Sequence, residues 1–575
     1  MVIASLGDAF LPSGICPKEV VVNMLFLTRV LKEREVWIIG LLSLIIFLPG
    51  INWGLPHATH ALGVHGWDMD AVAGLPTLVE LHHLFIVPES DWYVAYPIVH
   101  YLVLGVFYTP YIAWLYLTGG ISGSSSQYPF GLHDPVAVLQ NLALIGRAVA
   151  VLMATGIVIT CYLTARTIWD TATARFAAAA VALPTPIFYN ARVGTLDIPV
   201  LFWESLCILV IARCLAFGFT TKRAIWLGIL SALAVSTKDQ ATGPLALGLL
   251  TLLVIYILHQ RGDASATGTW KFPVALFLSG LVGFAVVSGL IFWPQRLFDH
   301  FVYIRNYEQN FFGMAAVFIR PPTLAGYAFV TWEVLTELFF SVGPIFLAIG
   351  SAGLILTIRR NPFAQVLCAM LVGHLVLVVW AVRLTQFRYI ILATYIFSFF
   401  IARAFALAFT QERAKWLVPV AFTCAVLGFA WLGLRCVNLT YQMFYDSRYQ
   451  AGKWIDQHTA PGDQLAFFTS QNVLPPLDGH IGLIKLYADP TPMEEILQSR
   501  PRFILAQPDF SSKIGSDRSH FFPDTVYDQL GDLGYTISAK FETPPLFSAF
   551  FLNNTLVGPG YYVNPPVTVF ELTRK

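Results

Sequence analysis

Residues 141–163 read NLALIGRAVAVLMATGIVITCYL and contain one charged side chain, Arg147. A helix needs about 20 consecutive apolar residues to cross the hydrocarbon core of a bilayer, so this stretch is predicted to span a membrane. Of the 575 residues in the chain, 56% are hydrophobic and 12% are charged, whereas soluble domains carry about 25% charged residues. Comparable apolar runs lie at 36–53, 174–192, 196–213, 224–240, 241–259, 273–293, 338–357, 364–382, 388–409 and 416–435. The predicted fold class is a polytopic α-helical membrane protein with about 11 spans.

The basic residues between these runs set the predicted orientation. Cytoplasmic loops of membrane proteins carry an excess of Lys and Arg. Every second loop here is basic. In chain order, the basic residues of these loops are Arg166 and Arg175; Arg213, Lys222 and Arg223; Arg261 and Lys271; Arg359 and Arg360; and Arg413 and Lys415. The alternation predicts a cytoplasmic N-terminus and places the residues after 440 outside.

The apolar segment 93–117 does not fit this alternation. The stretch 35–146 contains no Lys or Arg, so neither end of the segment has the charges of a cytoplasmic loop. Pro97 and Pro110, among many aromatic residues, are typical of an interfacial element. We predict a juxtamembrane or re-entrant helix on the outer side. A span paired with another, unrecognised span is the alternative.

The predicted domain organisation follows from the spans. Residues 1–35 form a cytoplasmic N-terminus, and residues 36–440 form the transmembrane domain with outer loops at 54–140 and 294–337. The less hydrophobic tail, 441–575, alternates helical and strand patterns and is predicted to be a small extracytoplasmic α/β domain. Its expected elements are helices at 446–458, 492–500 and 524–533 and strands at 464–468, 502–507, 535–542 and 567–573. All seven Cys precede this tail, so it is expected to fold without disulfides.

Several ionisable side chains fall at the predicted outer ends of the helices. An ionisable group at such a position is costly and is a functional candidate by default. A carboxylate there can act as a general base on an acceptor hydroxyl or amine, and a cation can stabilise a phosphate leaving group. The candidates are Asp68, Asp70, Glu80, Glu89, Asp91, Asp197, Lys238, Asp239, Arg383 and Arg388.

Short motifs around these residues occur in a characteristic order. They are Trp67-Asp68-Met69-Asp70, Tyr96-Pro97-Ile98-Val99-His100-Tyr101, Arg147, Arg192 followed by Asp197-Ile198-Pro199, Thr237-Lys238, Arg388-Tyr389, and Asp446-Ser447-Arg448 with Trp454-Ile455. Their order resembles the GT-C glycosyltransferases, above all glycosyltransferase family 39, which includes dolichyl-phosphate-mannose–protein mannosyltransferases, and the bacterial aminoarabinose transferases. The resemblance covers most of the chain and implies a GT-C fold in a bacterial plasma (inner) membrane.

The resemblance also implies an activity and residue roles. The expected activity is inverting transfer of a hexosyl or pentosyl group from a polyprenyl-phosphate donor to a protein, lipid or glycan acceptor at the outer membrane face. Asp68 is favoured as the base over Asp70, with Asp197 orienting or assisting it. The substrate-binding candidates are Lys238 and Arg388 for the phosphate, with Arg192 and Tyr96 as further candidates.

Two departures from the family pattern limit these expectations. The acidic pair is Asp-x-Asp rather than Asp-Glu, so either aspartate can be the base. Ala95 and Tyr96 replace a charged Glu-Lys pair of the aminoarabinose transferases, which argues against aminoarabinose as the sugar.

Other interpretations of the same residues stay open. Asp197 can serve as a helix cap, and Lys238 and Arg388 can be snorkelling interfacial residues. No cofactor is predicted, although six histidines between the first spans (His57, His60, His65, His82, His83 and His100) leave a divalent metal as an alternative. A non-catalytic component of surface polysaccharide assembly and a lipid or solute transporter are the competing functions. The expected partners are the lipid-linked donor, the acceptor and membrane lipids, and nucleic acid is not among them.

Overall fold

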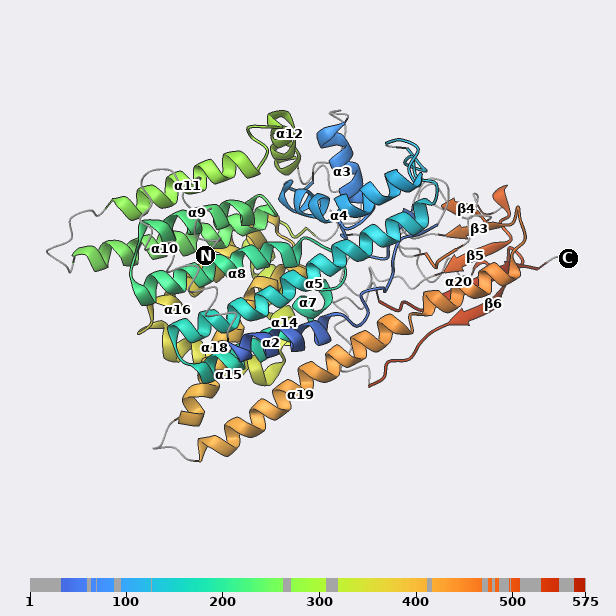
Figure 1. The fold of residues 1–575 in the computed structure, drawn as a ribbon. Coiled ribbons are helices and arrows are strands. Elements are labelled where there is room, and N and C mark those ends of the chain that lie inside the picture. Colours follow the sequence, from blue (N-terminus) through green and yellow to red (C-terminus); the bar gives the residue numbers. More distant parts are fainter. Residues whose placement is uncertain are drawn as a thin grey trace.

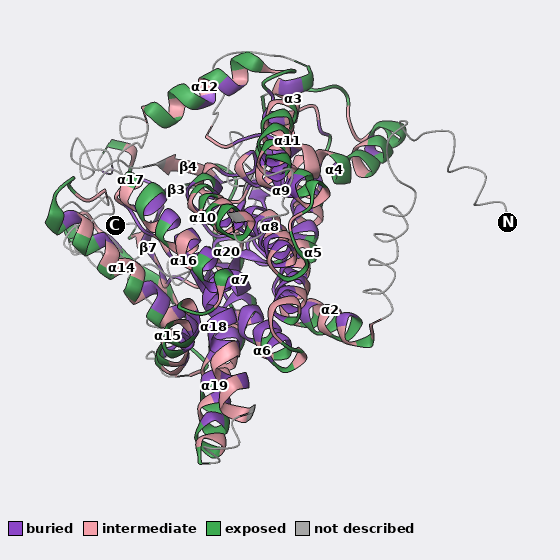
Figure 2. Ribbon diagram, turned by 90° about the vertical axis from the view of Figure 1, so that its left-hand side faces the viewer, coloured by how far each residue is buried: buried purple, intermediate pink, exposed green. Residues whose placement is uncertain are grey.

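The computed structural model describes residues 33–58, 64–68, 70–86, 95–125, 127–261, 270–306, 319–410, 416–467, 474–477, 481–485, 496, 498–506, 529–547 and 563–573. These residues form a long bundle of helices with a small sheet at one end (Figure 1). Buried residues occupy the middle of the bundle, and exposed residues lie along its rim (Figure 2).

The first half of the chain supplies one side of the bundle. Its elements are α2 (Arg34–Phe47), β1 (His57–Ala58), β2 (Val64–His65), α3 (Leu75–Phe85), α4 (Val99–Thr118), α5 (Pro135–Ile168), α6 (Thr171–Ala182), α7 (Thr185–Asn190), α8 (Asp197–Phe217), α9 (Thr221–Val235), the 3₁₀ turn η1 (Asp239–Ala241) and α10 (Thr242–Arg261). The strands β1 and β2 pair antiparallel within the first loop.

The second half completes the bundle and adds the sheet. Its elements are α11 (Lys271–Val287), α12 (Pro294–Arg305), α14 (Leu324–Val342), α15 (Pro344–Ile358), α16 (Pro362–His374), the π-helical stretch η2 (Leu375–Val379), α17 (Trp380–Val382), the 3₁₀ turn η3 (Phe387–Ile390), α18 (Ile391–Thr410), α19 (Leu417–Phe444), α20 (Ser447–His458), β3 (Gln464–Phe467), β4 (Gly482–Lys485), β5 (Phe503–Ala506), β6 (Tyr535–Phe541) and β7 (Val567–Leu572). The chain is thus a mostly helical, polytopic membrane protein with a small C-terminal sheet region.

The number of spans can be compared with the prediction within the described residues. Seven helices are long and apolar enough to cross a membrane, and α14 with α15 makes an eighth if the bent pair counts as one span. The remaining predicted spans coincide with α2, α6, α9 and α11, which have 14, 12, 15 and 17 residues. The helix α4 passes the same test, so its length suits a span, and its assignment as a juxtamembrane helix stays a prediction.

Among the candidate spans of the described residues, α18 is the most buried, and it contacts α6, α15 and α19. By contrast, α4, α11 and α19 leave large apolar side chains exposed, among them Val106, Phe277 and Phe422. Such side chains suit a surface in contact with lipid, where the surroundings are as apolar as the protein core. The helix α5 extends the predicted span at both ends and is about 51 Å long at 1.5 Å per residue, so it is longer than the hydrocarbon core.

The C-terminal region is a five-stranded sheet in the order β4-β3-β5-β7-β6. The strands β4 and β5 pair parallel with β3, and β7 pairs antiparallel with both β5 and β6. Leu465, Phe503 and Val569 form its core with Ile455 from α20. The predicted small C-terminal region with strands is confirmed, with β4 as a strand that the sequence did not indicate. Its assignment as a separate extracytoplasmic domain stays a prediction. The expected helices at 492–500 and 524–533 fall largely outside the described residues.

One predicted span is wrong in its boundaries. The run 338–357 was taken as a single helix, but the chain bends by 110° between α14 and α15. Pro344 has no backbone N–H to continue the helix, and Gly343 has φ +79°, which favours glycine. Residues 324–337, which were assigned to an outer loop, form most of α14 instead.

The bend yields a stability prediction. A Cβ added to Gly343 would lie 2.8 Å from Trp431 Cδ1 in addition to the strained φ, so Gly343→Ala should lower the free energy of unfolding by about 1–3 kcal/mol. Thermal unfolding in detergent, followed by intrinsic fluorescence, measures the change. Gly433→Ala in α19 is the matched control, because no atom lies within 4 Å of its added Cβ. Equal melting temperatures for the two variants would contradict the assignment of the bend to Gly343.

Candidate active site

Ionisable side chains from four distant segments come together beside the first loop. Asp68 and Asp70 lie in that loop, Asp197 begins α8, Lys238 lies between α9 and η1, and Arg388 lies in η3. The structure therefore brings together five of the ionisable candidates from the sequence, whereas Glu89 and Asp91 lie outside the described residues. Of the five, three are acidic and two are basic.

Asp68 is a buried carboxylate of the first loop, with a residue exposure of 8%. The Tyr189 hydroxyl donates a 2.6 Å hydrogen bond to Asp68 Oδ2, and the Asp70 backbone N–H donates a 2.9 Å bond to Asp68 Oδ1. Burial raises the pKa of the Asp68 carboxyl to about 6, and the charge of Asp70 adds to the rise. The Tyr189 bond opposes it because it stabilises the charged form.

Asp70 lies in a different environment from Asp68. Its side chain is 33% exposed and forms an ion pair with Arg388, whose side chain is 11% exposed. Burial alone would raise the pKa of Asp70, but the charge of Arg388 and its hydrogen bond outweigh burial, so the pKa falls below its ordinary value. Two carboxylates two residues apart are thus driven in opposite directions, which is a pattern common at catalytic sites.

Asp197 and Lys238 form a second ion pair, with 2.7 Å between Lys238 Nζ and Asp197 Oδ1. Both side chains are almost fully buried. The charge of Lys238 also acts on Asp70, so the two ion pairs belong to one electrostatic cluster. A buried pair of this kind depends on both partners, because either charge alone would be buried without compensation.

The backbone fixes the first loop against the start of α8. The Gly194 carbonyl accepts hydrogen bonds from the N–H groups of Val72 and Ala73, at 3.0 and 3.3 Å. Gly194 has φ +79°, and a Cβ there would lie 2.8 Å from the Ala73 Cβ. Glycine therefore allows the close approach that holds Asp68 and Asp70 next to Asp197.

Two further predicted site residues have other surroundings. Arg192 is fully buried, and its guanidinium donates to the carbonyls of Pro49 and Ile46 at 2.6 and 3.2 Å. These bonds satisfy carbonyl groups at and just after the end of α2, which gives Arg192 a structural role. We therefore leave Arg192 out of the proposed phosphate contacts. Tyr96 lies within electrostatic range of Arg388, and its carbonyl accepts a 2.6 Å bond from Arg296. A role of Tyr96 in substrate binding stays a prediction.

The sequence did not point to Tyr189 or to Arg296. Tyr189 lies inside a predicted apolar span, where its hydroxyl is the only signal of a polar contact. Arg296 donates a 2.8 Å bond to Glu80 and so attaches α12 to α3. Its partner is 216 residues away, and no local pattern indicates such a pairing.

The metal alternative can be examined within the described residues. No three His, Cys, Asp or Glu side chains among them are grouped so that they could hold an ion. His60, one of the six histidines considered, lies outside the described residues.

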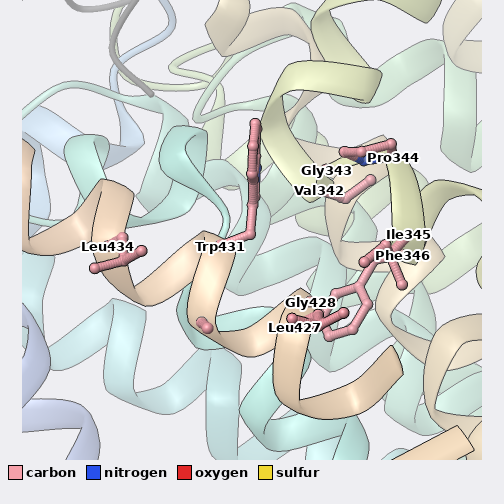
Figure 3. A pocket seen from close by; sticks show the side chains of 10 residues that line it. Val342, Gly343, Pro344, Ile345, Phe346, Leu427, Gly428, Trp431 and Leu434 are labelled. Atoms are coloured by element: carbon pink, nitrogen blue, oxygen red, sulfur yellow. The ribbon is translucent and has the colours of Figure 1, made fainter. Parts of the chain in front are cut away.

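An apolar cavity of about 280 Å³ lies elsewhere in the bundle. Its lining comes from the α14–α15 bend, with Val342, Pro344 and Phe346, and from α19, with Leu427 and Trp431 (Figure 3). None of the five ionisable residues lines it. The chemistry and this cavity therefore belong to different parts of the molecule.

Comparison with solved structures places this arrangement in a known fold. The chain is similar to ArnT from Cupriavidus metallidurans in the apo state, with a TM-score of 0.50 and 13% identity over 93% of this chain and 97% of that chain. The same protein bound to undecaprenyl phosphate gives a TM-score of 0.47 with the same identity and coverage. The apo oligosaccharyltransferase of Archaeoglobus fulgidus gives 0.47, with 11% identity over 84% of this chain and 71% of that chain. No protein-family model and no curated protein matches the chain. The fold is that of the GT-C glycosyltransferases, as predicted.

The hydrogen bond from Tyr189 yields a pH-dependent prediction. Hydrophobic carbodiimides modify protonated carboxyls, so Asp68 should be labelled with a midpoint near pH 6. Tyr189→Phe removes a donor that stabilises the charged form, so its midpoint should move upward. Peptide mass spectrometry measures the labelling. Tyr111→Phe, whose hydroxyl bonds to Asn141, should leave the midpoint unchanged; an identical midpoint in Tyr189→Phe would refute the assigned bond.

The buried ion pair yields a second prediction. Asp197→Asn should lower the free energy of unfolding by about 3–5 kcal/mol, because it leaves the buried Lys238 charge without its carboxylate. Lys238→Met should cost a similar amount, and the double variant should recover part of the loss. Melting temperatures of the four proteins form the double-mutant cycle. Additive losses would show that the two side chains are not coupled.

Proposed function

We propose that the chain is an inverting glycosyltransferase that moves a sugar from a polyprenyl-phosphate donor to an acceptor. The observation that carries the proposal is a buried carboxylate, Asp68, hydrogen-bonded to the backbone of Asp70, whose own carboxylate is under the charges of Arg388 and Lys238. A general base next to a place for a phosphate is what transfer from a sugar phosphate requires.

Asp68 is the proposed general base. With a pKa of about 6 it is ionised at neutral pH yet basic enough to take a proton. As the acceptor oxygen or nitrogen attacks the anomeric carbon, its proton passes to Asp68, and the bond between that carbon and the phosphate oxygen breaks. The configuration inverts, and the polyprenyl phosphate leaves with the bonding electrons. The Tyr189 hydroxyl holds the carboxylate in one orientation.

Arg388 and Lys238 are the proposed contacts of the leaving phosphate. Asp70 forms an ion pair with Arg388, and Asp197 forms one with Lys238, so both cations are neutralised. A donor phosphate can share Arg388 with Asp70, because that pair is partly open to solvent. Lys238 is held by Asp197, which keeps the ammonium in place while negative charge develops on the leaving group.

The proposed side of the membrane is supported by the basic loops and by one contact of the site. The Trp67 indole, next to Asp68, donates a 2.8 Å bond to the Leu474 carbonyl of the C-terminal region, so the carboxylates and the sheet lie on one side. We place that side outside, in agreement with the basic loops. The acceptor is then a protein, lipid or glycan outside the plasma membrane.

A transfer assay with membrane-extracted lipid-linked sugars tests the proposal. Asp68→Asn should lower kcat by a factor of about 100–10,000, since a general base contributes that much, while the affinity for the donor is unchanged. Arg388→Met should weaken donor binding instead. Asp170→Asn is the matched control, because Asp170 caps α6 and pairs with Arg403.

Full transfer by the Asp68→Asn variant would contradict the catalytic assignment. Donor binding by the wild-type protein without turnover would favour a non-catalytic component of polysaccharide assembly. Uptake of substrate into liposomes without covalent transfer would favour a transporter.

A further inference from the structure

A fully buried ion pair lies at the junction of α19 and α20, outside the groups assigned to chemistry. Arg448 donates to both carboxylate oxygens of Asp446, with Nε to Oδ1 at 2.9 Å and Nη2 to Oδ2 at 2.7 Å. Neither side chain has any exposed surface. Asp446 Oδ2 also accepts a 2.7 Å bond from the Asn564 backbone N–H, which precedes β7. The pair therefore connects the last span to the sheet.

The same pair reaches into the first loop. The Trp53 indole donates a 3.0 Å bond to Asp446 Oδ2, and the Arg448 guanidinium lies 3.7 Å from the centroid of the Trp67 ring. Stacking of a guanidinium on an indole at this distance is a favourable cation–π contact, which is strengthened by burial. Tyr449, the next residue, accepts a 3.0 Å bond from the Gly54 N–H and packs on Trp67 with 4.7 Å between ring centroids.

Trp67 is thus held on several sides. Its ring contacts Arg448, Tyr449 and Trp53, its indole N–H bonds to the Leu474 carbonyl, and its backbone N–H bonds to the Gly54 carbonyl at 3.1 Å. Asp68 is the next residue in the chain. A rotation of the Trp67 backbone would therefore move the Asp68 carboxylate away from the Tyr189 hydroxyl.

We propose that Asp446 and Arg448 are positioning residues for Asp68, which they act on through the Trp67 indole. The inference rests on the proposed transferase function for its kinetic consequence. The structural part of the inference, that the C-terminal region packs on the first loop and fixes the position of Asp68, does not depend on that function. The pair touches neither the donor nor the acceptor.

This role differs from simple stabilisation of the sheet. A buried pair that only held the domain together would, when broken, lower stability without a specific effect on Asp68. A positioning pair should alter kcat and the titration of Asp68 while the donor still binds, because Arg388 and Lys238 come from other elements. Displacements of about 1 Å from productive geometry can cost a factor of about 100 in rate.

The test compares Arg448→Met with Arg502→Met in the full chain. Arg502 also lies in the C-terminal region, pairs with Asp463 and Glu571 and lies 4.7 Å from the Phe503 ring centroid, but none of these partners belongs to the first loop. We expect Arg448→Met to lower kcat about 10- to 100-fold with the KM for the donor within about threefold, and Arg502→Met to stay near wild type. Arg448→Lys should recover only part of kcat, because an ammonium cannot make the bidentate, stacked contact.

Carbodiimide labelling of Asp68 provides the readout that does not need turnover. In Arg448→Met the labelling midpoint should shift from that of wild type, whereas in Arg502→Met it should not. If Arg448→Met does not fold, Trp67→Phe removes the indole N–H but keeps a ring, and it should give the same two changes. Unchanged kcat and labelling in a folded Arg448 or Trp67 variant would overturn the inference. A wild-type protein without transfer activity would refute the proposed function, while the labelling comparison would still decide the positioning role.

Discussion

Hydrogen bonds from the buried Arg147 guanidinium hold the segment that leads into the candidate site. Arg147 Nη1 donates to the carbonyls of Ile51 and Trp53 at 2.8 and 2.5 Å, so the segment that follows α2 is tied to α5. A charge buried among spans must find its partners within the protein. Here backbone carbonyls are those partners, and the course of the first loop follows from them. This attachment adds to the contacts that hold Trp67 and Asp68 in place.

Ion pairing explains how the other charged residues of the candidate site come together. The cations Lys238 and Arg388 come from turns that are 150 residues apart, and each finds an aspartate from yet another segment. Among the described residues, the hydrogen bonds to the Asp68 carboxylate come from the Tyr189 hydroxyl and the Asp70 backbone N–H rather than from a cation. This difference separates a carboxylate that can accept a proton from two that hold cations in place. The proposed division of labour among the three aspartates follows from it.

Much of this arrangement could be predicted from the sequence, and the rest depends on tertiary contacts. Apolar runs predicted the helical membrane fold, and the ends of those runs supplied the set of ionisable candidates to which the five clustered side chains belong. The orientation predicted from the basic loops stays a prediction. The sequence could not tell which aspartate pairs with which cation, because that depends on how α8, α9 and η3 pack. Tyr189 lies within an apolar run, so its polar contact was not predicted. Gly343-Pro344 marks a bend, but the apolar residues on both sides of it led to the prediction of one continuous helix. Arg192 was predicted to bind substrate because of its motif, but its hydrogen bonds go to backbone carbonyls at and just after the end of α2.

Determination of the structure with a bound polyprenyl-phosphate tests the central claim most directly, namely that the five ionisable residues surround the reacting phosphate. We predict phosphate oxygens within hydrogen-bond distance of Arg388 and Lys238, with the Asp68 carboxylate facing the position of the sugar. A phosphate bound away from both cations, with the Asp70–Arg388 and Asp197–Lys238 pairs unaltered and Asp68 out of reach, would contradict the account.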